Sequence, residues 1–83
     1  MLVTLAIVER FPCATYTDIG KIAGGLSDIV AYRRIQALML KGLLREFNNG
    51  FRIYLPDYID LDPYRREVDQ LVANLTDRVN PPV

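Results

Sequence analysis

The segment 48–50, Asn-Asn-Gly, constrains the fold most strongly, because it separates two short runs rich in aromatic and other β-favouring residues. These runs are residues 43–47 and residues 51–55, and Pro56 closes the second run. Asn-Gly is the strongest short-range signal for a β-hairpin, because its tight turn requires positive φ, which Asn tolerates and Gly adopts without steric cost. The sequence therefore predicts an antiparallel hairpin here.

Two helices are predicted near the beginning of the chain. The first covers Leu2–Arg10, and Pro12 ends it. The second covers residues 18–23, with Thr17 as its expected N-cap. Asp18 lies in the first turn of this second helix, where a negative charge interacts favourably with the helix dipole.

A third, longer helix is predicted over residues 28–41, after the break that Gly24 and Gly25 provide. Ser27 is its expected N-cap, and Gly42 is its expected C-terminal stop. Apolar residues recur along it at helical spacing and mark the side that we expect to be buried, namely Ala31, Ile35, Leu38 and Met39.

The last predicted helix begins with Asp62 as N-cap and Pro63 at the first helical position, and it continues as far as Arg78. The Asn-Pro-Pro segment 80–82 ends it, so the last residues are expected to be frayed. Its apolar stripe consists of Tyr64, Val68, Leu71, Val72 and Leu75. Together these elements predict an α+β, mostly helical fold for this chain of 83 residues.

Composition excludes several classes of function. The chain has one cysteine, Cys13, and no histidine, so neither a disulfide framework nor a Cys/His zinc site is expected. The most common catalytic base is therefore missing, and the sequence contains no Gly-rich phosphate loop. We expect no enzymatic activity, no metal and no cofactor, and nothing in the sequence indicates a small-molecule ligand.

Hydropathy indicates a cytoplasmic protein. No apolar run reaches the roughly 18 residues that a membrane span requires. The apolar segment 1–8 also lacks the basic region and the small-residue cleavage site of a signal peptide. We therefore expect no contact with a membrane.

Charge is distributed unevenly along the chain, although the formal net charge is zero. Between residues 21 and 52, six cations face only two anions, Asp28 and Glu46. The six cations are Lys21, Arg33, Arg34, Lys41, Arg45 and Arg52. Acidic residues predominate after Leu55, so the middle of the chain is the candidate surface for nucleic-acid contact.

Three motifs lie in this middle region. Residues 16–23 read Tyr-Thr-Asp-Ile-Gly-Lys-Ile-Ala, residues 26–27 read Leu-Ser, and residues 38–45 read Leu-Met-Leu-Lys-Gly-Leu-Leu-Arg. With these motifs the region 16–55, about half of the chain, resembles the winged helix-turn-helix family of transcriptional regulators, in the style of small MarR-, PadR- and Lrp-like proteins. The resemblance implies a three-helix bundle with a β-hairpin wing over residues 1–57, and an extra C-terminal helix in residues 58–83.

This resemblance implies a sequence-specific regulator, such as a repressor, whose third helix enters the major groove of double-stranded DNA. Arg33 is expected to contact guanine and Gln36 adenine, while an apolar residue, Ile29 or Val30, contacts a thymine methyl group. Phosphate or sugar contacts are expected from other positions, including the wing tip. The complete expected DNA-binding set is Thr17, Lys21, Ser27, Asp28, Ile29, Val30, Tyr32, Arg33, Arg34, Gln36, Asn48, Asn49 and Arg52.

Several of these residues have a purely structural alternative. Asp28 fits a first-turn partner of the helix dipole better than a reader of cytosine. The hairpin turn needs segment 48–50 whether or not it touches DNA. The aromatic residues Phe47, Phe51 and Tyr54 are more typical of core or strand-pair positions than of base-stacking platforms. Because no second strand with aromatic and basic residues is evident, single-strand binding is not expected.

A homodimer is predicted from the apolar surfaces of the terminal helices. The first helix is apolar around almost its whole circumference, so it must be covered on more than one side. A two-fold contact with the last helix of a second copy would bury both, and it would place two third helices on a palindromic site. The expected interface is Leu2, Leu5, Tyr64, Val68, Leu71, Val72 and Leu75. In the alternative, the last helix folds back onto the first within one chain.

The sequence is also compatible with a second class of function. Zero net charge and an acidic C-terminal part favour a winged-helix module that contacts proteins, or an antagonist that sequesters another DNA-binding protein.

Overall fold

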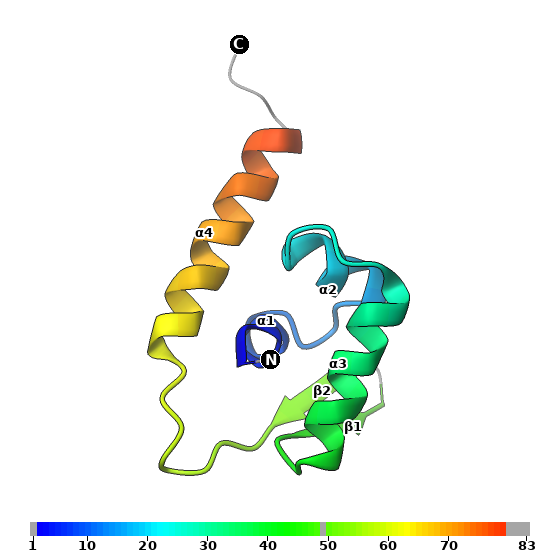
Figure 1. The fold of residues 1–83 in the computed structure, drawn as a ribbon, viewed down its shortest axis with the longest axis vertical. Coiled ribbons are helices and arrows are strands. Elements are labelled where there is room, and N and C mark those ends of the chain that lie inside the picture. Colours follow the sequence, from blue (N-terminus) through cyan, green and yellow to red (C-terminus); the bar gives the residue numbers. More distant parts are fainter. Residues whose placement is uncertain (1, 49, 80–83) are drawn as a thin grey trace.

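Four helices and one antiparallel hairpin make up the part of the chain that the computed structural model describes, which is residues 2–48 and 50–79, with side chains up to residue 75 (Figure 1). The elements follow the order α1 (Leu2–Arg10), α2 (Tyr16–Ile22), α3 (Asp28–Leu40), β1 (Leu44–Phe47), β2 (Gly50–Ile53) and α4 (Asp62–Val79). The expected α+β, mostly helical fold is therefore confirmed. The frayed tail expected at the end of the chain lies outside the described residues.

Helix α1 occupies the centre of the fold. Five successive residues, numbers 4–8, are buried, so α1 is covered on every side. It contacts α2, α3, β2 and α4 (Figure 1). This arrangement follows from its sequence, because a helix that is apolar around its circumference can lose its exposure to water only by lying inside a ring of other elements.

Helix α2 begins two residues earlier than the sequence indicated. Its N-cap is Thr15, whose hydroxyl accepts a hydrogen bond from the Asp18 amide at 3.1 Å. The Asp18 carboxylate accepts one in return from the Thr15 amide at 3.3 Å, which completes a capping box. The expectation that Thr17 caps this helix is therefore wrong. With Thr15 as the N-cap, the backbone amides of Thr15 and Asp18 both gain hydrogen-bond partners, whereas Thr17 already lies inside the helix.

Both ends of α3 agree with the sequence. The Ser27 hydroxyl accepts a hydrogen bond from the Val30 amide at 3.3 Å, so Ser27 is confirmed as the N-cap. At the other end, Gly42 has a φ of 74°, which favours glycine, and its amide donates to the Met39 carbonyl. The Leu43 amide donates to the Leu38 carbonyl, which completes a Schellman motif and ends the helix at Leu40.

Strands β1 and β2 pair in antiparallel register, with Leu44 opposite Ile53 and Arg45 opposite Arg52. The strands are slightly shorter than expected, although the Tyr54 amide still donates to the Leu43 carbonyl beyond the last assigned pair. The hairpin is attached to the α1–α2 connection, because the Phe51 amide donates to the Pro12 carbonyl at 2.9 Å.

Helix α4 folds back onto α1 within the same chain, as the alternative from the sequence proposed. Leu5 and Val68 are 0% and 1% exposed, so neither is available to a second subunit, and their expected place in a dimer interface is corrected. The other expected interface residues are only partly buried, namely Leu2, Tyr64, Leu71, Val72 and Leu75. The apolar stripe of α4 thus meets apolar surface in its own chain.

Ion pairs reinforce the contact between α1 and α4. The Arg65 guanidinium donates to both carboxylate oxygens of Glu9, at 2.6 and 2.8 Å, and Arg10 pairs with Asp69. Arg65 also bonds Asp62 one turn earlier in α4.

Within residues 2–48 and 50–79, no helix has the length and hydropathy needed to cross a bilayer.

Candidate nucleic-acid interface

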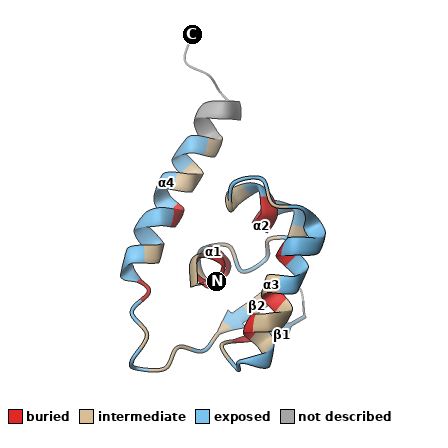
Figure 2. Cartoon of the chain, viewed as in Figure 1, coloured by how far each residue is buried: buried red, intermediate tan, exposed pale blue. Residues whose placement is uncertain are grey.

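The outer side of α3 is open to solvent along its N-terminal half. Ala31, Ile35 and Leu38 are at most 1% exposed and face the core, which confirms the predicted buried side (Figure 2). On the opposite side Arg33 is exposed, and Ile29 keeps 64% of its surface accessible. The helix therefore presents a mixed face, with one cation and neighbouring apolar groups, to whatever approaches it.

Not every residue expected on this face is equally accessible. Arg34 and Gln36 are only half-buried, and the Gln36 amide lies 4.0 Å from the Met39 sulfur, a weak contact along the helix. Val30 is 36% exposed and Tyr32 47% exposed. Of Arg33, Arg34 and Gln36, which are all expected to approach DNA, Arg33 is thus the most accessible.

Asp28 is joined to α2 by a hydrogen bond. Its carboxylate accepts from the Thr17 hydroxyl at 3.0 Å, so the first turn of α3 is tied to the first turn of α2. This contact favours the structural interpretation of Asp28, whose charge also lies at the positive end of the α3 dipole. Thr17 thereby acts in orienting the two helices, although it does not cap α2.

An aromatic cluster connects α3, α2 and the hairpin. The Tyr16 ring packs edge-on against Tyr32 at a centroid distance of 5.3 Å and lies 6.3 Å from the Phe51 ring. Burial raises the pKa of Tyr16, and the nearby Glu46 charge raises it further. Phe51 is half-buried, in agreement with the expected core or strand-pair role. The cluster fixes the position of the hairpin relative to α3.

The hairpin carries four exposed residues that we call the hairpin outer face: Arg45, Phe47, Arg52 and Tyr54. The Arg45 guanidinium carbon lies 5.6 Å from the Tyr54 ring centroid, and that of Arg52 lies 5.0 Å from the Phe47 ring centroid. Phe47 and Tyr54 are 47% and 39% exposed, so neither lies in the core, and of the two expected structural roles Phe47 has the strand-pair one, opposite Gly50. Arg45 and Phe47 lie on one side of β1, and on the same side of the hairpin Arg52 of β2 is followed by Tyr54 directly after the strand.

Most of the described cations without a carboxylate partner belong to α2, α3 and the hairpin region. In the described part of the chain, the ion pairs involve only α1 and α4. The cations of α2, α3 and the hairpin region make none, namely Lys21, Arg33, Arg34, Lys41, Arg45 and Arg52. Asn48 is exposed near the hairpin turn, and Asn49 lies outside the described residues. Ion pairing is therefore confined to α1 and α4 among the described residues, and the cations of the middle of the chain stay without a carboxylate partner.

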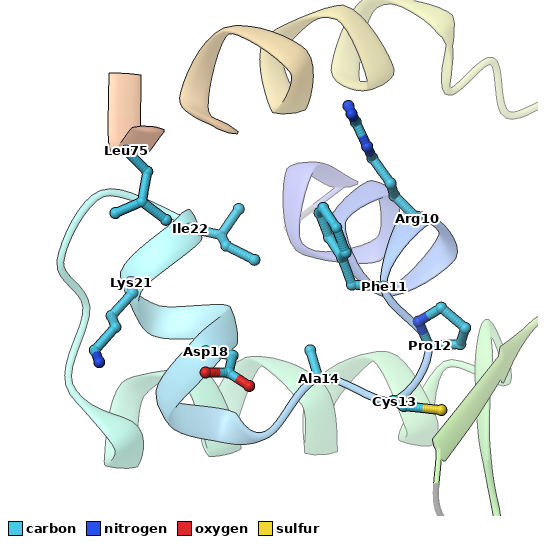
Figure 3. A pocket seen from close by; sticks show the side chains of 9 residues that line it. All are labelled: Arg10, Phe11, Pro12, Cys13, Ala14, Asp18, Lys21, Ile22 and Leu75. Carbon is cyan, nitrogen blue, oxygen red and sulfur yellow. The ribbon is translucent and has the colours of Figure 1, made fainter. Parts of the chain in front are cut away.

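A cavity of about 460 Å³ lies between the α1–α2 connection, α2 and α4, and of these cations only Lys21 is among its lining residues (Figure 3). Phe11, Ile22 and Leu75 supply apolar walls, and the Lys21 side chain points away from the centre (Figure 3). The polar groups of Arg10 and Asp18 are already bonded to Asp69 and to the Thr15 amide. The cavity therefore offers apolar contact without a polar anchor.

Among the residues described, no three carboxylate or thiol side chains gather as metal ligands.

Comparisons of the chain with models of protein families, with curated proteins and with solved structures found no match.

Proposed function

We propose that this protein is a winged helix-turn-helix regulator that binds double-stranded DNA, with α3 in the major groove and the hairpin on the adjacent backbone. The observation that carries the proposal is the exposed Arg33 side of α3. It lies in the part of the fold whose cations have no carboxylate partner. A helix that is apolar on one side and open on the other can enter a groove about 12 Å wide without unfolding.

Roles are divided between bases and phosphates. Arg33 is the candidate for bidentate contact with guanine, and Ile29 for contact with a thymine methyl group. Lys21, exposed on α2, and Arg52, on the hairpin, contact phosphates and set the register of the protein on DNA. Gln36 contributes less than the sequence indicated, because it is half-buried.

Binding to a random duplex tests the proposal directly. At about 50 mM salt the electrostatic contribution is strong, so fluorescence anisotropy should detect binding of a labelled duplex, and it should weaken steeply with added salt. Arg33→Ala should relax the base preference of a sequence selected from a random pool. Lys21→Ala should weaken all sequences alike and reduce the salt slope by about 1. Arg66→Ala, on exposed α4 surface, is the control and should bind normally.

A second function is favoured by one specific observation. Ile29 is 64% exposed and Tyr32 is 47% exposed on the same helix, which is substantial apolar surface for a DNA-reading face. A winged-helix module that contacts another protein would use the same surface. Absence of duplex binding at about 50 mM salt would reject the DNA proposal and favour this alternative.

A homodimer remains part of the proposal, on the partly buried surface only. Leu2, Tyr64, Leu71 and Leu75 are not fully covered in the single chain. Leu71→Gln together with Leu75→Gln should convert a dimer into a monomer in analytical ultracentrifugation. A wild-type chain that sediments as a monomer at all concentrations would reject the dimer without affecting the DNA proposal.

A further inference from the structure

The hairpin outer face has a composition that the folded chain does not itself require. Arg45 and Arg52 lie directly opposite each other in the strand register. Like charges at directly opposed positions destabilise a strand pair. Neither arginine has a carboxylate partner among the described residues, and the two aromatic rings beside them are 39–47% exposed. A bound anion with an aromatic part would offset both costs.

The hairpin outer face alternates arginine side chains with aromatic rings. Arg45 and Phe47 are two residues apart, as are Arg52 and Tyr54, so each pair lies on one side of its strand. Each guanidinium lies over the ring contributed by the other strand. The face therefore alternates phosphate-binding groups with stacking groups along a two-stranded ribbon. Glu46 does not interrupt it, because it lies on the opposite side of β1 from Arg45.

We propose that the hairpin outer face binds single-stranded DNA, with bases stacked on Phe47 and Tyr54 and phosphates contacted by Arg45 and Arg52. Unpaired bases expose a π-face that stacks on aromatic rings or on guanidinium planes, and paired bases within a duplex do not. This site does not include the Arg33 side of α3, and it shares only Arg52 with the proposed duplex contacts. It would let the protein engage an unpaired segment, and it does not depend on duplex recognition by α3.

The first measurement uses a labelled thymidine strand of about 15 nucleotides in fluorescence anisotropy. Wild-type protein should bind it at about 50 mM salt. Phe47→Ala and Tyr54→Ala should each weaken binding by about fivefold to a hundredfold, because one stacked base is lost. Phe47→Tyr and Tyr54→Phe keep the rings and should bind like wild type. Tyr58→Ala, which removes an 86% exposed ring elsewhere, should also have no effect.

A second probe separates stacking from charge. The same strand with abasic sites keeps the phosphates and removes the bases, so it should bind much more weakly than the thymidine strand. Arg45→Gln and Arg52→Gln should each make the salt dependence shallower by about 0.7. Circular dichroism melts identify any variant that fails to fold, and for such a variant the ring-conserving substitution and the abasic strand decide the outcome.

Two results would overturn this inference. One is an absence of thymidine-strand binding at about 50 mM salt, and the other is equal affinity for the abasic strand. Arg33→Ala distinguishes this site from the duplex site, because it should relax the base preference in duplex binding and leave the affinity for single-stranded DNA unchanged. Duplex binding without single-strand binding rejects only the hairpin site. The reverse result rejects only the proposed duplex function.

Discussion

The Leu26 backbone folds back onto Gly20 with no room for a side chain between them. The Leu26 amide donates to the Gly20 carbonyl at 2.9 Å, and a Cβ on residue 20 would lie 2.3 Å from the Leu26 carbonyl oxygen. This contact sets how closely α2 approaches the turn before α3. The relative placement of the two helices therefore depends on a hydrogen atom at residue 20.

Gly20→Ala should destabilise the protein by about 1–3 kcal/mol, because backbone atoms must move to admit the methyl group. Alanine normally stabilises a helix relative to glycine, so the expected sign is opposite to that for an open helical site. Urea unfolding followed by circular dichroism measures the change. A variant as stable as wild type would contradict the close approach. If α3 reads DNA, this variant should also lose duplex affinity under conditions in which it is folded.

Thr15→Ala should lower the free energy of unfolding by about 1 kcal/mol, because the Asp18 amide loses its cap. Thr17→Ala is the matched control, since it removes only one exposed hydrogen bond to Asp28 and leaves the cap in place. We expect the Thr15 variant to melt at the lower temperature of the two. The opposite order would restore Thr17 as the cap.

Thr4→Val should stabilise the protein by about 1 kcal/mol, since a buried hydroxyl without a partner carries a desolvation cost. Thr4 is 0% exposed, and its hydroxyl finds no hydrogen-bond partner among the described residues. Valine has nearly the same shape. Val8→Thr, at another fully buried position one turn later in α1, places a hydroxyl in the core and should lower stability. Thermal melts of the two variants should therefore shift in opposite directions.

The Glu9–Arg65 ion pair should make the α1–α4 contact sensitive to acid. The hydrogen bond from Arg65 lowers the pKa of Glu9 below its ordinary value of 4.5, against a smaller opposing contribution from burial. Because the unfolded chain holds this proton more tightly, the stabilisation is complete above pH 4.5 and is lost as the pH falls through the folded-state pKa.

Glu9→Gln tests this expectation. Its melting temperature should lie slightly below that of wild type at neutral pH, and the two should converge in acid. Glu67→Gln, on exposed α4 surface without an ion pair, should show no such pH-dependent difference. A constant difference between Glu9→Gln and wild type at all pH values would mean that the pair does not act through its charge.

Local signals in the sequence were sufficient for most of the fold. Ser27 and Gly42 each act within a few residues, so the ends of α3 could be predicted without tertiary information. The hairpin was predicted at the correct place, but Gly50 belongs to β2 opposite Phe47, and a Cβ there would lie 2.5 Å from the Pro12 carbonyl oxygen, which is a tertiary contact. The Thr15 cap was also detectable, because a carboxylate three residues later completes a capping box. Thr17 directly precedes Asp18, but position alone is a weaker indication of an N-cap than the reciprocal bonds between Thr15 and Asp18.

Long-range relationships could not be predicted in the same way. An apolar stripe on α4 indicates that the helix is buried but not which chain covers it, so the sequence predicts a subunit interface at Leu5 and Val68 where the structure has contact within one chain. Similarly, Phe47 and Tyr54 are residue types that favour strands, but residue type does not indicate which face of the hairpin each ring occupies. Only the register, with Arg45 opposite Arg52, shows that both rings lie on the outer side.

The opposed arginines give ionic strength two contrary effects on one hairpin. Mobile anions screen the repulsion between Arg45 and Arg52, so added salt should tighten the strand pair in the unbound protein. The same ions compete with phosphates for these guanidinium groups, so complexes should weaken as the free hairpin becomes more rigid. Structural order and affinity at this site are thus expected to vary in opposite directions with a single solution variable.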